Sequence, residues 1–260
     1  MKPLLMFALA ALASTPVAAR SPQVSAAPDI GRKPAPDRPA GQSGGTSPDG
    51  LPDLSQLAPD ADPQVLALGL SAMQCAQAHG TGVDARRLAV IDYSRSSLTP
   101  RLWVFDLAQR KLLYKELVAH GQGSGGDVPD RFSNEDGTHA SSLGLFYTRD
   151  TYQGKNGYSL RMQGLERGFN DAAMRRAIVM HGAPYVNADS GRKMGRLGRS
   201  WGCPALRAAM ARPIIEVMKD GQFVFSYSPQ QAWLTRSSLA QCAMARLHGR
   251  PDPGKALATR

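Results

Sequence analysis

Long hydrophobic runs are missing from this sequence of 260 residues. The apolar run near its N-terminus extends only from Leu4 to Leu12, whereas a membrane-spanning helix needs about 20 apolar residues. With Lys2 before it and small residues at 17–19 after it, this run is typical of a secretory signal peptide over residues 1–19. We therefore expect an exported protein, periplasmic or elsewhere in the cell envelope, with no stable membrane insertion after cleavage. No nearby cysteine supports a lipidated N-terminus.

Aromatic and β-branched residues are scarce between residues 20 and 61, where proline, glycine and serine are frequent. Such a composition buries too little apolar surface to offset the entropy lost on ordering, so residues 20–61 are predicted to be a disordered linker. The rest of the chain is predicted to form an N-terminal helical region at 62–87, a main domain at 88–228, and a C-terminal helix and tail at 229–260.

Helical patterns are few. Asp62 and Pro63 suit the start of a helix, and Gly80 suits its end. Further helices are expected within 203–221, where Pro213 can break the helix, and within 228–247. Runs rich in β-branched and aromatic residues predict strands at 87–93, 101–107, 112–120, 142–148, 158–164, 177–181 and 223–227, with a tight hairpin at 106–111. Many strands with few helices predict a mainly β domain.

Cysteine is also rare, with three in the chain. An exported protein can hold disulfides, and Cys75 and Cys242 fall on the first and last predicted helices. We predict that these two pair, which would tie the ends of the domain together and leave Cys203 free. Two unpaired thiols, or a bond that involves Cys203 in an inactive enzyme, are the alternatives. A papain-like role for Cys75 is less favoured, because Cys75 lies in the apolar stripe of a helix.

Cys203 and His181 form the candidate catalytic pair. His181 ends an apolar strand beside Gly182, and Cys203 stands between a glycine and a proline. We expect Cys203 to cap a helix whose first turn is 204–206, because the N–H groups of a helix start favour a thiolate. His181 would then act as general base. Cations expected to lower the thiol pKa further are Arg192, Lys193, Arg196, Arg199 and Arg207.

His120 and His139 lie in loops rich in glycine and serine, where function tends to concentrate. Each would either line a substrate cleft or cap a turn. Together with His181 and Cys203 they could form a metal site, but none of the spacings matches a compact pair such as C-x-x-C or H-E-x-x-H. A metal-dependent peptidase is therefore a less favoured alternative, and no metal or other cofactor is expected.

The segment HG at 181–182, followed after seventeen residues by SWGC at 200–203, resembles the signature of YkuD-type L,D-transpeptidase catalytic domains, and especially that of the murein L,D-transpeptidases. Further similar stretches are AHGQGSG, FSNEDGTHASSLGLF, YQGKNGYSLRMQGLERGFND and RRAIVMHGAPYV, all within about residues 88–228. The resemblance implies a mainly β fold, a sandwich or barrel-like sheet, with a few peripheral helices.

The resemblance also implies roles for individual residues. Cys203 would be the acylated nucleophile and His181 its base, while the backbone N–H groups of Gly202 and Cys203 would bind the oxyanion. Ser200 and Gly182 would shape the loop. Many members carry arginine or asparagine two positions after the cysteine, where this chain has Ala205. The candidates for substrate binding are Arg207, which could replace that residue, Arg199, His120 and His139.

The activity implied by the resemblance is acyl transfer on peptidoglycan tetrapeptide stems through a thioester. An amine acceptor would give 3-3 cross-links, and water would trim the terminal D-alanine.

The net charge of +10 suits a carboxylate-rich cell wall, although the charged residues could equally form an ordinary solvated surface. The basic residues are dispersed and no nucleic-acid module accompanies them, so nucleic acid is not an expected partner. A non-catalytic peptidoglycan-binding module is the alternative function.

Overall fold

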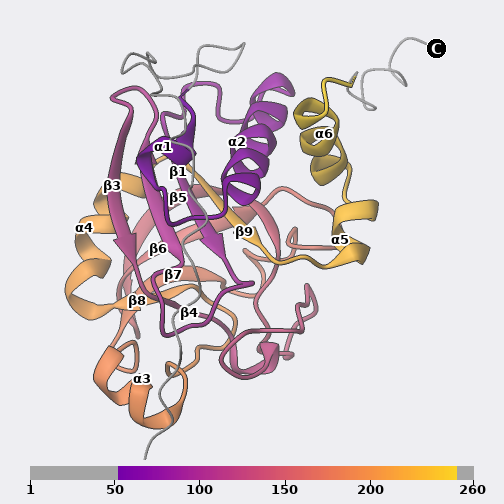
Figure 1. Cartoon of the computed structure of the whole chain (residues 1–260). Coiled ribbons are helices and arrows are strands. Elements are labelled where there is room, and N and C mark those ends of the chain that lie inside the picture. Colours follow the sequence, from indigo (N-terminus) through magenta and orange to yellow (C-terminus); the bar gives the residue numbers. More distant parts are fainter. Residues whose placement is uncertain (1–51, 251–260) are drawn as a thin grey trace, which may run out of the picture. The chain divides into compact units, whose positions relative to one another are not determined.

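Nine strands form one nearly closed, barrel-like sheet in the computed structural model, which describes residues 52–250 (Figure 1). The strand order is β3-β2-β1-β9-β5-β6-β7-β8-β4. The strands are β1 (Arg87–Asp92), β2 (Leu102–Asp106), β3 (Lys111–Glu116), β4 (Val118–Ala119), β5 (Gly144–Gly154), β6 (Gly157–Gly164), β7 (Val179–Ala183), β8 (Ala205–Arg207) and β9 (Phe223–Tyr227). The prediction of a mainly β fold is confirmed. The predicted signal peptide lies outside the described residues.

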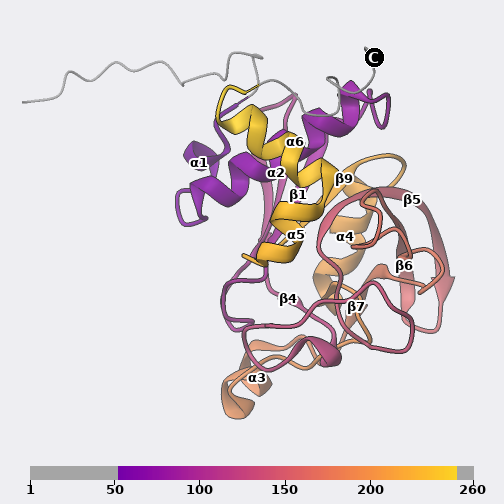
Figure 2. The ribbon, with the colours of Figure 1, turned by 90° about the vertical axis from the view of Figure 1, so that its right-hand side faces the viewer.

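The helices are short and few. They are α1 (Leu54–Leu57), α2 (Pro63–Ala78), α3 (Ala188–Met194), α4 (Ala208–Met218), α5 (Gln231–Arg236) and α6 (Ser238–Leu247), with a 3₁₀ turn, η1, at Gln122–Ser124. Helices α2 and α6 pack side by side, while α3 lies at the opposite end of this folded part in both views (Figures 1 and 2). No helix in residues 52–250 is long and apolar enough to cross a membrane.

The strands β1, β2 and β9 are buried along nearly their whole length. Both α2 and α4 pack on β1, so this strand carries a continuous apolar run rather than an alternation of apolar and polar residues. All seven predicted strands are present, and β2 and β3 form the predicted hairpin. Two details differ: the predicted strand at 112–120 divides into β3 and β4, and the strand predicted at 142–148 extends to Gly154.

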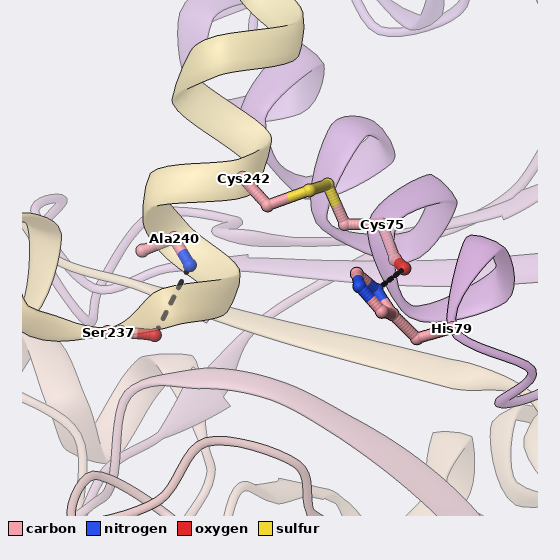
Figure 3. The surroundings of a disulfide bond; sticks show 5 residues. All are labelled: Cys75, His79, Ser237, Ala240 and Cys242. Carbon is pink, nitrogen blue, oxygen red and sulfur yellow. Dashed lines mark hydrogen bonds between the residues drawn. A yellow bond between two sulfur atoms is a disulfide. The ribbon is translucent and has the colours of Figure 1, made fainter. Parts of the chain in front are cut away.

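The predicted start of α2 is confirmed. The carboxylate of Asp62 accepts a hydrogen bond from the N–H of Gln64 at 2.8 Å, and Pro63 occupies the first turn. The predicted pairing of Cys75 with Cys242 is also confirmed, because a disulfide joins α2 to α6 (Figure 3). Ser237 separates α5 from α6, and its hydroxyl caps α6 by accepting a hydrogen bond from the N–H of Ala240.

Ordered structure begins before residue 61, the predicted end of the linker. Asp53 caps α1, and Leu54 and Ala58 are buried in the core. Burial of these apolar residues offsets the cost of ordering the segment, which the proline-rich composition had obscured. The last part of the predicted linker therefore belongs to the folded part, and its residues 20–51 lie outside the described residues.

The segment after Cys203 differs from the prediction. Residues 204–206 were expected to be the first turn of a helix, but Ala205–Arg207 form β8, and α4 begins only at Ala208. β8 pairs in parallel with β7 and antiparallel with β4, so pairing with distant strands decides its conformation. Pro213 lies inside α4 without breaking it.

Candidate active site

The sheet brings His181 and Cys203 to neighbouring segments. His181 on β7 lies opposite Ala205 on β8, two positions after Cys203. The N–H of Val179, also on β7, lies 3.5 Å from Sγ of Cys203 and donates to it. The sequence between them forms α3 and its flanking loops, so a long connection returns the cysteine to the strand that carries the histidine.

A tight turn at residues 200–203, here called the Cys203 turn, fixes the cysteine. The hydroxyl of Ser200 donates to the carbonyl of Cys203 at 2.6 Å and accepts from the N–H of Gly202 at 3.1 Å. The hydroxyl of Ser141 donates to the carbonyl of Gly202 at 3.0 Å and accepts from the N–H of Gly121 at the same distance. The N–H of Gly202, expected to bind the oxyanion, is thus already engaged by Ser200.

Glycine at position 202 has a structural cause. Its φ is 116°, a conformation that side chains other than glycine rarely adopt. A Cβ atom there would also lie 2.8 Å from the carbonyl oxygen of Ala140. Any larger residue would therefore move the turn and the cysteine that follows it.

The thiol of Cys203 is buried, with the residue 8% exposed. Burial raises its pKa, and the N–H of Val179 and the charge of Arg176 only partly oppose this effect. The expectation of a lowered thiol pKa is therefore wrong, because burial outweighs the groups that favour the thiolate; the expected helix start at Cys203 is also missing, since α4 begins only at Ala208. In this structure the Sγ–H donates to the carbonyl of Ala177 at 3.7 Å.

His181 is 3% exposed, and burial lowers its pKa, so the imidazole is neutral at pH 7. Its Nδ1 lies 2.9 Å from the carbonyl oxygen of Gly182. A carbonyl only accepts, so Nδ1 carries the proton and Nε2 holds a lone pair. His181 is therefore in the form that a general base requires. A Cβ atom at position 182 would meet Ala211 of α4 at 2.9 Å, so glycine permits the close packing of β7 against α4.

The cations near the site have different partners from those expected. Arg207 holds the buried carboxylate of Glu116 through two hydrogen bonds, from Nε at 2.8 Å and from Nη2 at 2.5 Å. Arg199 donates to the backbone carbonyl of Gly125, and Arg192 pairs with Asp189. The positive charge that acts on the thiol comes instead from Arg176, which the sequence analysis missed. Its only signal in the sequence is its place just before the strand that carries His181.

The two other candidate histidines, His120 and His139, differ in exposure. His120 is buried, with 1% of the residue exposed, so its side chain does not line an open cleft in this structure. Its carbonyl accepts from the N–H of Ser200 at 2.9 Å, which places it beneath the Cys203 turn. The ring of His139 stacks on Trp201, with centroids 4.7 Å apart and planes 9° apart. Trp201 is 69% exposed and was not singled out from the sequence.

Among residues 52–250, no group of three or more His, Cys, Asp and Glu side chains is placed to hold a metal ion. The metal site considered for His120, His139, His181 and Cys203 is therefore not assembled in this part of the chain.

Of the comparisons with known proteins, one identifies a family. The family described as the L,D-transpeptidase catalytic domain matches residues 57–227. A search of curated proteins found no match. Solved structures similar to this chain include an L,D-transpeptidase from Mycobacterium smegmatis (15% identity, 55% of this chain and 59% of that chain, TM-score 0.35). Another is an L,D-transpeptidase from Mycobacterium tuberculosis H37Rv (14% identity, 55% and 58%, TM-score 0.33).

A third similar structure is the helical cell shape determining protein Pgp2 from Campylobacter jejuni (9% identity, 70% of this chain and 62% of that chain, TM-score 0.39). This chain spans about three fifths of the length of these three proteins. At such TM-scores the three likenesses carry no argument about function. The family match covers more than half of the sequence, and so the chain belongs to the L,D-transpeptidase catalytic domain family.

Proposed function

We propose that this protein is an exported cysteine L,D-transpeptidase that acts on tetrapeptide stems of peptidoglycan. The observation that carries the proposal is that the sheet places His181 on β7 opposite Ala205, two positions after the free cysteine, Cys203, while Nδ1 of His181 lies 2.9 Å from the carbonyl of Gly182. Membership of the family supports the reaction class. The signal-like N-terminal sequence supports export.

The protonation states favour attack by general base catalysis rather than by a preformed thiolate. Burial raises the pKa of the Cys203 thiol and lowers that of the His181 imidazole, so both groups are neutral at rest. The Sγ–H would turn from the carbonyl of Ala177 towards Nε2 of His181 when substrate binds. Catalytic hydrogen bonds often form fully only in the substrate complex.

In the proposed reaction, Sγ of Cys203 attacks the carbonyl carbon of the third stem residue while His181 takes the thiol proton. The tetrahedral oxyanion collapses, the C–N bond to D-alanine breaks, and His181 protonates the leaving amine. A thioester remains on Cys203. The amine of a second stem would resolve it to a 3-3 cross-link, and water would leave a tripeptide stem. The N–H of Gly202 could bind the oxyanion only by leaving Ser200.

Intact mass spectrometry of the mature protein incubated with a disaccharide tetrapeptide tests this proposal. Wild type should gain the mass of the disaccharide tripeptide acyl group and release D-alanine, and Cys203→Ala should do neither. A carbapenem, which can acylate the same thiol, serves as a second probe. The pair Cys75→Ser with Cys242→Ser is the matched control, because it removes sulfur atoms away from the reaction and should keep the adduct.

Three other results would contradict the proposal. Binding of the stem peptide with no adduct and no D-alanine release would favour a non-catalytic binding module. An adduct that persists in Cys203→Ala would place the nucleophile elsewhere. Release of D-alanine that a chelator abolishes and zinc restores would favour a metal-dependent peptidase.

A further inference from the structure

Arg176 makes an unusual set of contacts next to the site. Its Nη1 donates to the carbonyl of Ser133 and the hydroxyl of Ser142, both at 2.7 Å. Its Nη2 donates to the carbonyl of Ala140 at 2.7 Å and lies 3.5 Å from the hydroxyl of Thr138. All four acceptors belong to one loop, residues 133–142, so a single guanidinium fixes the shape of that loop.

This loop is one wall of the Cys203 turn. Ser141 lies between two of the acceptors of Arg176 and hydrogen-bonds the carbonyl of Gly202. The carbonyl of Ala140, which accepts from Arg176, is also the atom that a Cβ at position 202 would strike. Movement of the loop would therefore move the turn that carries Cys203.

The backbone that follows Arg176 contacts the sulfur of Cys203. The next residue, Ala177, provides the carbonyl that accepts from Sγ, and Val179 provides the N–H that donates to Sγ. Ala177 has a φ of 51°, which is uncommon for alanine and indicates that the segment is held by its surroundings. The segment 176–179 thus contacts both the 133–142 loop, through the side chain of Arg176, and the sulfur of Cys203, through the backbone of Ala177 and Val179.

Arg176 is the cation that interacts with the thiol of Cys203. The titratable groups that interact with Cys203 are Tyr93, Tyr185 and Arg176, and His181 lies on the adjacent strand. Burial raises the pKa of both tyrosines, that of Tyr185 to about 12, so both are neutral at pH 7. The carboxylate of Asp136 interacts with Arg176 from the loop, but Asp136 is exposed and screened by solvent.

We propose that Arg176 is a positioning residue for the nucleophile: its guanidinium fastens the 133–142 loop against the Cys203 turn, and its charge favours the thiolate that forms during attack. This proposal rests on Cys203 being the nucleophile. However, the measurement that tests it, the ionisation of the Cys203 thiol, can be made without any catalytic turnover.

The test is the pH dependence of alkylation of Cys203 by iodoacetamide, since the thiolate is the reactive form. Arg176→Gln should raise the thiol pKa by about one unit and slow alkylation at pH 7 about tenfold. Arg176→Lys keeps the charge but cannot fill four acceptors, so it should retain most of the alkylation rate while amide exchange in residues 133–142 becomes faster. Arg175→Gln, an exposed neighbour that loses the same charge, should match wild type in both measurements.

The proposal fails if a folded Arg176→Gln keeps the wild-type alkylation profile, or if Arg175→Gln shifts it equally, because the effect would then be one of net charge. If Arg176→Gln does not fold, Arg176→Met, which keeps the aliphatic stem, provides the same test. Unfolding of Arg176→Lys together with both neutral variants would assign Arg176 a purely structural role and overturn the proposal. Shifted alkylation without any acyl-enzyme would instead reject the proposed function and leave the effect of Arg176 on the thiol intact.

Discussion

His120 is a buried residue next to the Cys203 turn, and its side chain contacts a buried arginine. Its Nδ1 lies 2.8 Å from Nη2 of Arg101, which can only donate, so the imidazole must be neutral with its proton on Nε2. Arg101 is itself fully buried and donates two hydrogen bonds to the carbonyl of Val118. Burial lowers the pKa of Arg101 to about 10, which still leaves it charged at pH 7. His120 therefore has a permanent positive charge beside it.

Acid should destabilise the fold through His120. Burial, followed by the charge of Arg101, lowers its pKa from 6.5 to about 4, so between these values the unfolded chain binds a proton that the folded chain does not. The free energy of unfolding should fall as pH drops through this window, by about 3 kcal/mol in total. His120→Gln, which can still accept from Arg101, should flatten the dependence in urea unfolding at pH 7, 6 and 5. The exposed His248→Gln should leave the slope unchanged. Because burial also lowers the pKa of His181, part of the slope should remain in His120→Gln, and only a slope as steep as that of wild type would refute the assignment.

The contact between α2 and α6 is an element-scale feature in which two distant segments stabilise each other. The disulfide between Cys75 and Cys242 closes a loop with a sequence separation of 167 residues. Such a long loop restricts the unfolded chain strongly. Near the disulfide, Nδ1 of His79 lies 2.7 Å from the carbonyl of Cys75 at the end of α2 (Figure 3).

Loss of this disulfide should destabilise the domain without affecting the thiol of Cys203. The double variant Cys75→Ser with Cys242→Ser should lower the free energy of unfolding by about 2–5 kcal/mol, because the unfolded chain regains the entropy of an open loop. Thermal unfolding under oxidising conditions measures the loss, and added reductant should lower the wild-type midpoint to that of the variant. Cys203→Ala, which removes an unpaired thiol, should respond to reductant as wild type does. A double variant as stable as wild type would contradict the argument.

Elements with a strong local signal could be predicted from the sequence, and those set by distant pairing could not. β1, β2 and β9 are apolar runs that any compact arrangement would bury. β8 has three residues after a proline, a pattern that locally favours a helix start, and only its pairing with β7 and β4 makes it a strand. The expectation that Cys203 caps a helix was wrong for the same reason.

The residues of the candidate site also differ in whether the sequence alone could point to them. Cys203 and His181 could be proposed as candidates from the sequence because each stands beside a glycine in the pattern HG…SWGC and carries chemistry suited to a nucleophile and a base. Arg176 could not, because its acceptors lie 34 to 43 residues earlier in the sequence for three of its hydrogen bonds. Nothing local distinguishes it from the adjacent Arg175. Only the folded structure shows which of the two arginines meets the loop.

At the scale of the whole folded part, one buried carboxylate connects the sheet to the C-terminal helices. Glu166, just after β6, accepts from the N–H of Leu145 on β5 and from Nε1 of Trp233 on α5, each at 2.6 Å, and from the hydroxyl of Ser237 before α6. Burial raises its pKa, and these three donors oppose that shift. The carboxylate is thus a junction between β5, α5 and α6, and α6 is in turn bonded to α2.

Glu166→Gln should therefore destabilise the chain, although it removes only a charge. An amide has one accepting oxygen, and its NH₂ group would face at least one of the three donors, which leaves buried donors unpaired. We expect a loss of about 2 kcal/mol or more in the free energy of unfolding, measured by urea at pH 7, with faster amide exchange in α5 and α6. Glu135→Gln, an exposed site that loses the same charge, should be within experimental error of wild type. If Glu166→Gln were as stable as Glu135→Gln, a neutral group would serve the junction equally well, and the C-terminal helices would have to be held by the disulfide and apolar packing alone.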